Sequence, residues 1–302
     1  MSDFLNIESI SQLHKMLGYQ KPEHPLVTVL DYSKIKADSN HYDIKIVTDF
    51  YVISLKSPSP KSVQYGRQYY DFEEGSIMFL SPKQVFSVSD FNENNKSQGW
   101  GIYFHPDLIS NSALGQKIKD FSFFSYAVSE ALHVSEKEKQ ILTSLSATII
   151  GEYSEKLDEY SQGVIITAIE QLLNYSQRFY SRQFLTRKKL NKDLISRFED
   201  LLKTHFQSEK LKENGLPKID YFASQLRLSP NYLTDLLKKE TGKTAKEHIH
   251  LTVISSAKYK LLNSADSVKE IAFSLGFEYP QYFSRLFKSK TGLTPLEFRE
   301  VR

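Results

Sequence analysis

The spacing of hydrophobic residues divides the chain into a strand-rich first part and a helical remainder. Up to about His105, short β-branched and aromatic runs are separated by turns such as Ser57-Pro58-Ser59-Pro60. This pattern is typical of an all-β sandwich or barrel. Beyond it, apolar residues recur at helical spacing. We therefore expect an α+β chain of two domains, because its 302 residues fit about two domains of ~100–200 residues each.

Two amphipathic helices are predicted to follow the strands. Ser135 and Glu138 fit a capping box at the start of the first helix. The second helix, residues 161–182, carries a wide aliphatic stripe that can pack on its own domain or pair with a second chain. We therefore expect helix 161–182 to be the dimer helix of a homodimer. Polar, basic residues 186–190 indicate a linker between an N-terminal domain, 1–185, and a C-terminal domain, 191–302.

The C-terminal domain contains one segment twice. Residues 232–242 match residues 282–292 at an offset of fifty, and their lead-ins, 222–226 and 271–275, match at forty-nine. A solenoid or propeller needs about three or more copies, so the repeat does not indicate one. A duplicated helical unit of this size instead predicts two helix-turn-helix units.

Double-stranded DNA is the partner that this duplication favours. The residues between the copies, 245 to about 263, are predicted as one helix about 28 Å long, whereas major-groove segments on one face of DNA recur every ~34 Å. A rigid spacer of this length can set two recognition helices into adjacent groove turns. Residues 183–302 carry 22 Lys and Arg against 14 Asp and Glu, while residues 1–182 carry 17 against 22. Only the C-terminal part is therefore basic enough to favour a polyanion.

The polar side of each predicted recognition helix supplies the candidate DNA contacts. Arg can bind guanine bidentately, and Asn or Gln can bind adenine, whereas Lys one turn further along suits phosphates. The expected base contacts are Pro230, Asn231, Thr234, Asp235, Pro280, Gln281, Ser284 and Arg285. The expected phosphate contacts are Lys238, Lys239, Lys288 and Lys290.

Three C-terminal motifs resemble the signature of the AraC/XylS transcriptional regulators. They are Leu275-Gly276-Phe277, the run from Tyr282 to Lys288, and the run from Gly292 to Arg299. The resemblance covers roughly the last hundred residues and implies two helix-turn-helix units that are joined by a long helix and bind DNA without a cofactor. Arg227 and Leu237 depart from the family pattern in the first unit, which leaves the base contacts of that unit less defined. Many members also carry an N-terminal cupin-like barrel that senses a small molecule, followed by dimerising helices.

A cupin-like barrel is expected here as well, because the segment from Asp71 to Pro82 is similar to the strand-turn-strand of such barrels. Tyr65, Tyr69 and Trp100 are candidates for an effector pocket in it, with filling of the hydrophobic core as the alternative. No His-x-His lies in the strand region, and His248 and His250 fall in a helix, where positions two apart do not share a face. We therefore expect no metal, no cofactor and no catalytic residues.

The leading hypothesis is a sequence-specific transcriptional regulator, activator rather than repressor, controlled by a small molecule and with RNA polymerase as a further candidate partner. The alternatives are a constitutive regulator whose barrel only dimerises, or a cupin-type metal enzyme. The chain has no cysteine, so neither a disulfide nor a thiolate zinc site is expected. Its start lacks the pattern of a signal peptide, and no run approaches the ~18 apolar residues of a membrane span. A cytoplasmic protein is therefore expected.

Overall fold

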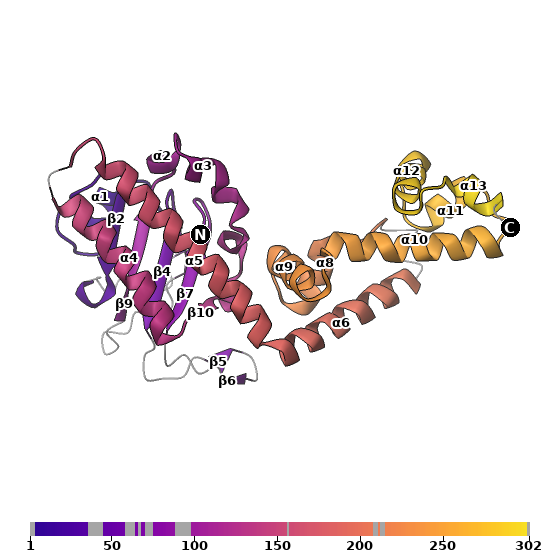
Figure 1. Cartoon of the computed structure of the whole chain (residues 1–302), viewed down its shortest axis with the longest axis horizontal. Helices are drawn as coiled ribbons and strands as arrows, with labels where there is room; N and C mark the ends of the chain where they lie inside the picture. The colour runs from indigo at the N-terminus through magenta and orange to yellow at the C-terminus, as the bar shows by residue number, and fades with distance from the viewer. Residues whose placement is uncertain are drawn as a thin grey trace. The chain divides into compact units, whose positions relative to one another are not determined.

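The computed structural model describes residues 4–35, 45–57, 64–65, 68–69, 75–87, 98–155, 157–207, 211 and 215–300. The chain forms two compact units, Met1–Gln183 and Phe184–Arg302 (Figure 1). Each unit has its own core. Strands are confined to the first unit, and the described part of the second unit is helical.

The described residues of the first unit form three separate sheets. The largest has the order β10-β7-β4-β9-β2 and is antiparallel throughout; its strands are β2 (Val27–Asp31), β4 (Tyr51–Ser57), β7 (Ser76–Leu80), β9 (Gln98–Phe104) and β10 (Leu132–His133). The second has the order β1-β3-β8, formed by β1 (Phe4–Ile7), β3 (Lys45–Thr48) and β8 (Val85–Ser87). The third pairs β5 (Gln64–Tyr65) with β6 (Gln68–Tyr69).

The closed cupin-like barrel expected from the sequence is not observed, since no sheet closes on itself within the described ranges. Part of the segment behind that expectation, residues 71–74, lies outside the described residues. Residues of alternate parity face opposite sides of a strand, and here both sides of the large sheet are apolar. One side joins a buried cluster with α1 (Ile10–Met16), and the other is covered by helices. Within the described residues, buried apolar side chains therefore lie on both sides of the large sheet.

Two long helices, α4 (Glu136–Ser154) and α5 (Ser161–Thr186), lie across the large sheet (Figure 1). The capping box expected at Ser135 and Glu138 is present at the start of α4. The aliphatic stripe of α5 is buried within the single chain, including Ile165, Ile169, Leu172 and Leu173. A subunit interface on α5 would therefore have to use its other face. The remaining helices of this unit are short: α2 (Pro106–Ile109), α3 (Ala113–Lys117) and 3₁₀ turns at Tyr32–Lys34, Ile118–Asp120, Ser122–Ser125 and Val128–Glu130.

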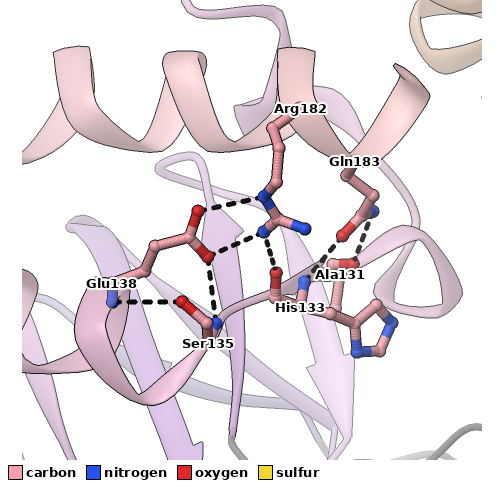
Figure 2. A network of polar contacts seen from close by, with 6 residues as sticks. All are labelled: Ala131, His133, Ser135, Glu138, Arg182 and Gln183. Atoms are coloured by element: carbon pink, nitrogen blue, oxygen red, sulfur yellow. Dashed lines mark hydrogen bonds and ion pairs between the residues drawn. The ribbon is translucent and has the colours of Figure 1, made fainter. Parts of the chain in front are cut away.

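The end of α5 is fastened to the first unit by a polar network (Figure 2). The Arg182 guanidinium donates to both carboxylate oxygens of Glu138, at 2.9 and 2.8 Å, and to the backbone oxygen of His133 at 2.7 Å. Gln183 accepts from the His133 amide at 2.8 Å and donates to the Ala131 oxygen at 3.3 Å. The same Glu138 carboxylate closes the capping box of α4. One ion pair thus joins the N-terminus of α4, strand β10 and the last turns of α5.

The second unit is built from α6 (Lys188–Gln207), α8 (Ile219–Leu226), α9 (Pro230–Thr241), α10 (Ala245–Asn263), α11 (Val268–Ser274), α12 (Pro280–Thr291) and α13 (Pro295–Glu300). These helices share one hydrophobic cluster. Each fully buried Phe in it, such as Phe222, Phe283 and Phe287, contributes about 1.5–3 kcal/mol relative to exposure.

The segment expected as a linker, residues 186–190, is largely helical. Thr186 ends α5, Arg187 forms a turn, and α6 begins at Lys188, three residues earlier than the hydrophobic spacing indicated. The polar composition that suggested a linker belongs to the adjoining ends of α5 and α6, and sequence alone does not distinguish helix ends from a loop.

Candidate nucleic-acid interface

The first helix-turn-helix unit consists of α8, a turn at Arg227 and Leu228, and α9. Ser229 caps α9 by accepting from the Tyr232 amide at 3.2 Å, Pro230 occupies the first helical position, and Gly242 ends the helix at φ 75°. These local signals were legible in the sequence. Arg227 adopts φ 57°, a left-handed conformation that is unfavourable for a residue with a Cβ atom.

The second unit repeats this arrangement with α11 and α12. Ser267 and Glu270 form a capping box at α11, Pro280 is again the first residue of the recognition helix, and Gly292 ends it at φ 82°. The residue that precedes α12 is Tyr279, whose side chain makes no capping hydrogen bond. The two units therefore share their helical frame but differ at the start of the recognition helix.

Gly276 links the second turn to the segment that enters the first unit. It has φ 84°, and its backbone oxygen accepts from the Leu216 amide at 3.2 Å. A Cβ at this position would lie 2.8 Å from the carbonyl carbon of Gly215 and 2.9 Å from the nitrogen of Leu216. Only glycine allows both this conformation and this approach. The backbone contact holds the turn of one unit against the lead-in of the other.

Each recognition helix buries one side in the shared cluster and leaves the other available. Leu233 and Leu237 of α9, and Phe283 and Phe287 of α12, are buried. Of the expected base contacts, Asn231, Gln281 and Arg285 are exposed, whereas Pro230, Thr234, Asp235, Pro280 and Ser284 are half-buried. The Thr234 hydroxyl donates to the Pro230 oxygen at 2.9 Å. The outward face of α9 thus carries the Asn231 amide, and that of α12 carries the Gln281 amide and the Arg285 guanidinium.

The four expected phosphate contacts, Lys238, Lys239, Lys288 and Lys290, are all exposed and lie along the C-terminal halves of α9 and α12. Their field extends to Glu247 near the start of α10. Hydrogen bonds from the backbone and hydroxyl of Thr244 lower the pKa of Glu247, and Lys290 and Lys238 lower it further. Lysines of both recognition helices therefore raise the potential around one helix N-terminus, which favours an anionic partner.

The spacer between the units is one continuous helix, as expected. Helix α10 contacts α9 of the first helix-turn-helix unit and α11 and α12 of the second. Its buried residues in the shared cluster are Ala245, Ile249, Val253, Ala257 and Leu261. At 1.5 Å per residue its 19 residues span about 28 Å. A straight helix packed along its length fixes the separation of the two recognition helices, which a flexible linker would not.

Burial differs between two tyrosines that the repeat places at equivalent positions, a difference that sequence reasoning missed. Tyr232 of α9 is 5 % exposed and packs against Phe184 with ring centroids 5.1 Å apart, whereas Tyr282 of α12 is 55 % exposed. Asn191 of α6 reinforces the covered face of α9 by donating to the Phe184 oxygen at 2.5 Å and to Glu240 at 2.8 Å. The residues that make this difference are Phe184 at the end of α5 and Asn191 of α6, which lie outside the repeated segment.

Of the three candidate effector-pocket residues, the structure describes the side chain of Trp100 alone. Trp100 lies between the large sheet and α4, where its indole N–H donates to the Thr143 hydroxyl at 3.0 Å, so it belongs to the core. Tyr65 and Tyr69 lie in β5 and β6, and their side chains fall outside the described residues. Across the described ranges, no three His, Asp or Glu residues are grouped as a metal site would require. No helix in those ranges is long and apolar enough to cross a bilayer.

Comparisons with known proteins identify the helical unit. A family model described as a helix-turn-helix domain matches residues 222–300. The transcriptional regulatory protein YesN of Bacillus subtilis is 42% identical over 76 residues, 24% of this chain and 21% of that protein. The Msm operon regulatory protein of Streptococcus mutans is 23% identical over 275 residues, 91% of this chain and 92% of that protein.

Two further matches cover 28% and 36% of this chain. The activator RhaR of Salmonella heidelberg is 34% identical over 83 residues, 29% of its length, so the chain spans less than a third of that relative and of YesN. The C-terminal domain of AraT, a response regulator from Geobacillus stearothermophilus, is 26% identical, with 36% of this chain and 85% of that structure covered at a TM-score of 0.32. The family resemblance drawn from the sequence is thus confirmed for residues 222–300, which are a helix-turn-helix domain of the AraC/XylS type.

Proposed function

We propose that the protein is a transcriptional regulator that binds a specific sequence of double-stranded DNA through both helix-turn-helix units. The observation that carries this proposal is the rigid pairing of two recognition helices along α10, with exposed amide, guanidinium and ammonium groups on their outward faces. Two such helices at fixed separation fit successive major-groove segments on one face of the duplex. The names of the relatives, transcriptional regulators and an activator, agree with this class of function.

The proposed contacts divide by chemistry. Asn231, Gln281 and Arg285 present donors or acceptors that match base edges, and the half-buried Pro230, Thr234, Asp235, Pro280 and Ser284 shape the surface beside them. Lys238, Lys239, Lys288 and Lys290 neutralise phosphates, which sets position rather than sequence. Arg285 and Lys288 therefore separate the two roles within one helix.

Selection of a preferred duplex from a random pool by the purified full chain tests the proposal. Arg285→Ala is expected to relax the preference at one or two positions, by about 1–3 kcal/mol per base pair. Lys288→Ala is expected to weaken binding to all duplexes alike and to lower the salt slope by about one. Enrichment of no sequence by the wild-type chain would refute sequence-specific recognition, and equal losses on all duplexes from both substitutions would refute the division of roles.

For the N-terminal unit we propose binding of a small molecule that controls the regulator, with activation as the output. This part of the proposal rests on the family resemblance and on the match to the Msm operon regulatory protein, which extends over 91% of this chain and so includes the N-terminal unit. Tyr65 and Tyr69 remain candidate pocket residues. The proposal also includes a homodimer, RNA polymerase as a partner and action in the cytoplasm. Native mass spectrometry of the freshly purified chain tests the ligand and the dimer together, and a bare monomer would contradict both.

A further inference from the structure

Arg285 has an unusual setting for an exposed arginine on a candidate DNA-binding face. Within the described residues its guanidinium makes no hydrogen bond or ion pair with a protein acceptor, and its contact is the ring of Tyr282, 5.9 Å from ring centroid to guanidinium carbon. Residues three apart on a helix are neighbours, so the contact is intrahelical. A cation above an aromatic face is held without consuming any of its N–H donors.

Tyr282 is itself held in place. Its ring meets that of Tyr279 edge to face, with centroids 5.7 Å apart. The stack therefore runs from the residue before α12 to the first turn and then to Arg285. Tyr282 is 55 % exposed, so burial in the core does not account for its position.

The first helix-turn-helix unit lacks this arrangement of tyrosine and arginine, although its sequence is similar. The tyrosine at the equivalent position, Tyr232, is in the core against Phe184, and the residue equivalent to Arg285 is Asp235. An exposed tyrosine beside an arginine is thus a property of the second recognition helix and not of the repeat as such.

We propose that Tyr282 is a positioning residue for Arg285, which holds the guanidinium in the orientation that binds a guanine in the major groove. The planar, five-donor guanidinium gains specificity from a fixed direction, and fixing it before binding lowers the conformational entropy lost on contact. The inference rests on the proposed DNA-binding function and names the residue pair that sets its specificity. Tyr282 acts through Arg285 and not by reading a base itself.

The experiment uses the full chain and the duplex that the wild type selects from a random pool. The guanine in question is the position at which Arg285→Ala loses its preference, by about tenfold or more. Tyr282→Ala is expected to reduce discrimination at that same position by about two- to fivefold and to leave the other positions unchanged. Tyr282→Phe, which keeps the ring face, should retain discrimination, and Tyr282→Leu should behave like alanine.

Controls separate this role from general destabilisation. Tyr259→Ala, at a tyrosine of α10 that is 71 % exposed, should leave discrimination unchanged. In an Arg285→Ala background, Tyr282→Ala should cause no further loss at the guanine. Unchanged discrimination in Tyr282→Ala, or an equal loss at every position, would overturn the inference while leaving DNA recognition intact. Failure of the wild type to select any duplex would instead refute the proposed function.

Discussion

Replacing Gly276 with alanine tests the backbone contact that joins the two helix-turn-helix units. The substitution forces a Cβ onto a residue with φ 84° and into contact with the backbone of Gly215 and Leu216. Gly292→Ala is the matched control, because Gly292 has φ 82° and nothing lies within 4 Å of its added Cβ. Comparing the two substitutions separates the cost of the Cβ contact with Gly215 and Leu216 from the cost of the left-handed backbone, which both substitutions share.

The magnitudes follow from these two differences. Left-handed strain in a non-glycine residue costs roughly 1–2 kcal/mol, and the lower entropy of the unfolded alanine chain offsets roughly 0.4–1 kcal/mol of it. Gly292→Ala should therefore lower the free energy of unfolding by about 1 kcal/mol. In Gly276→Ala the neighbouring backbone must also move, which costs about 1–3 kcal/mol and weakens the hydrogen bond from Leu216 to Gly276. We expect a loss of about 3 kcal/mol.

Urea unfolding of the full chain measures this difference, because two signals report on different units. Trp100, the single tryptophan, reports on the first unit by fluorescence, while far-UV circular dichroism also follows the helical second unit. Gly276→Ala should shift the circular dichroism transition well below that of Gly292→Ala and leave the fluorescence transition in place. Equal losses from the two substitutions would refute the reasoning that the backbone contact carries energy.

Three further outcomes are expected from the same unfolding measurement. Asn191→Ala removes two hydrogen bonds from a side chain that is 1 % exposed, and should cost the second unit about 2–3 kcal/mol, whereas Asn174→Ala at an exposed position of α5 should cost little. Arg227→Gly relieves a left-handed arginine and should raise the stability of the second unit by up to about 1 kcal/mol; a loss would show that the Arg227 side chain makes a compensating contact. Hydrogen bonds within the capping boxes lower the pKa of three carboxylates. The stability that these carboxylates contribute is therefore complete above their usual pKa of 4.5 and is lost as the pH falls through the lowered values. Glu270→Gln should make the free energy of unfolding less dependent on pH in this range, and an unchanged acid profile would contradict this expectation. The three carboxylates are Glu247, Glu270 and Glu297.

The helical half could be predicted closely because its signals are local. The Ser229 cap, Pro230 and Pro280 at first helical positions, and Gly242 and Gly292 at helix ends each depend on residues within one turn. The burial of Tyr232 could not be read in this way. Its covering residue, Phe184, lies 48 positions earlier, and the matching segment around Tyr282 has an exposed ring.

The strand half was predicted only as a class, because sheet order and register depend on long-range pairing. Trp100 illustrates the limit. Strand β9 lies between β4 and β2 and pairs with both, with Leu55 and Asp31 opposite Trp100, and this register turns the indole toward α4. No residue adjacent to Trp100 in the chain encodes that choice, so the sequence left a cavity open as an alternative to the core.

The hydrophobic cluster shared by both repeats has a consequence for how the C-terminal unit opens. Residues of α9, α10, α11 and α12 belong to one cluster, so neither repeat owns a core that would survive without the other. In native-state amide exchange the backbone amides of α9 and α12 should therefore exchange with the same opening free energy, as a single foldon. The two repeats therefore form one cooperative unit, in which a destabilising substitution in either repeat lowers the stability of both.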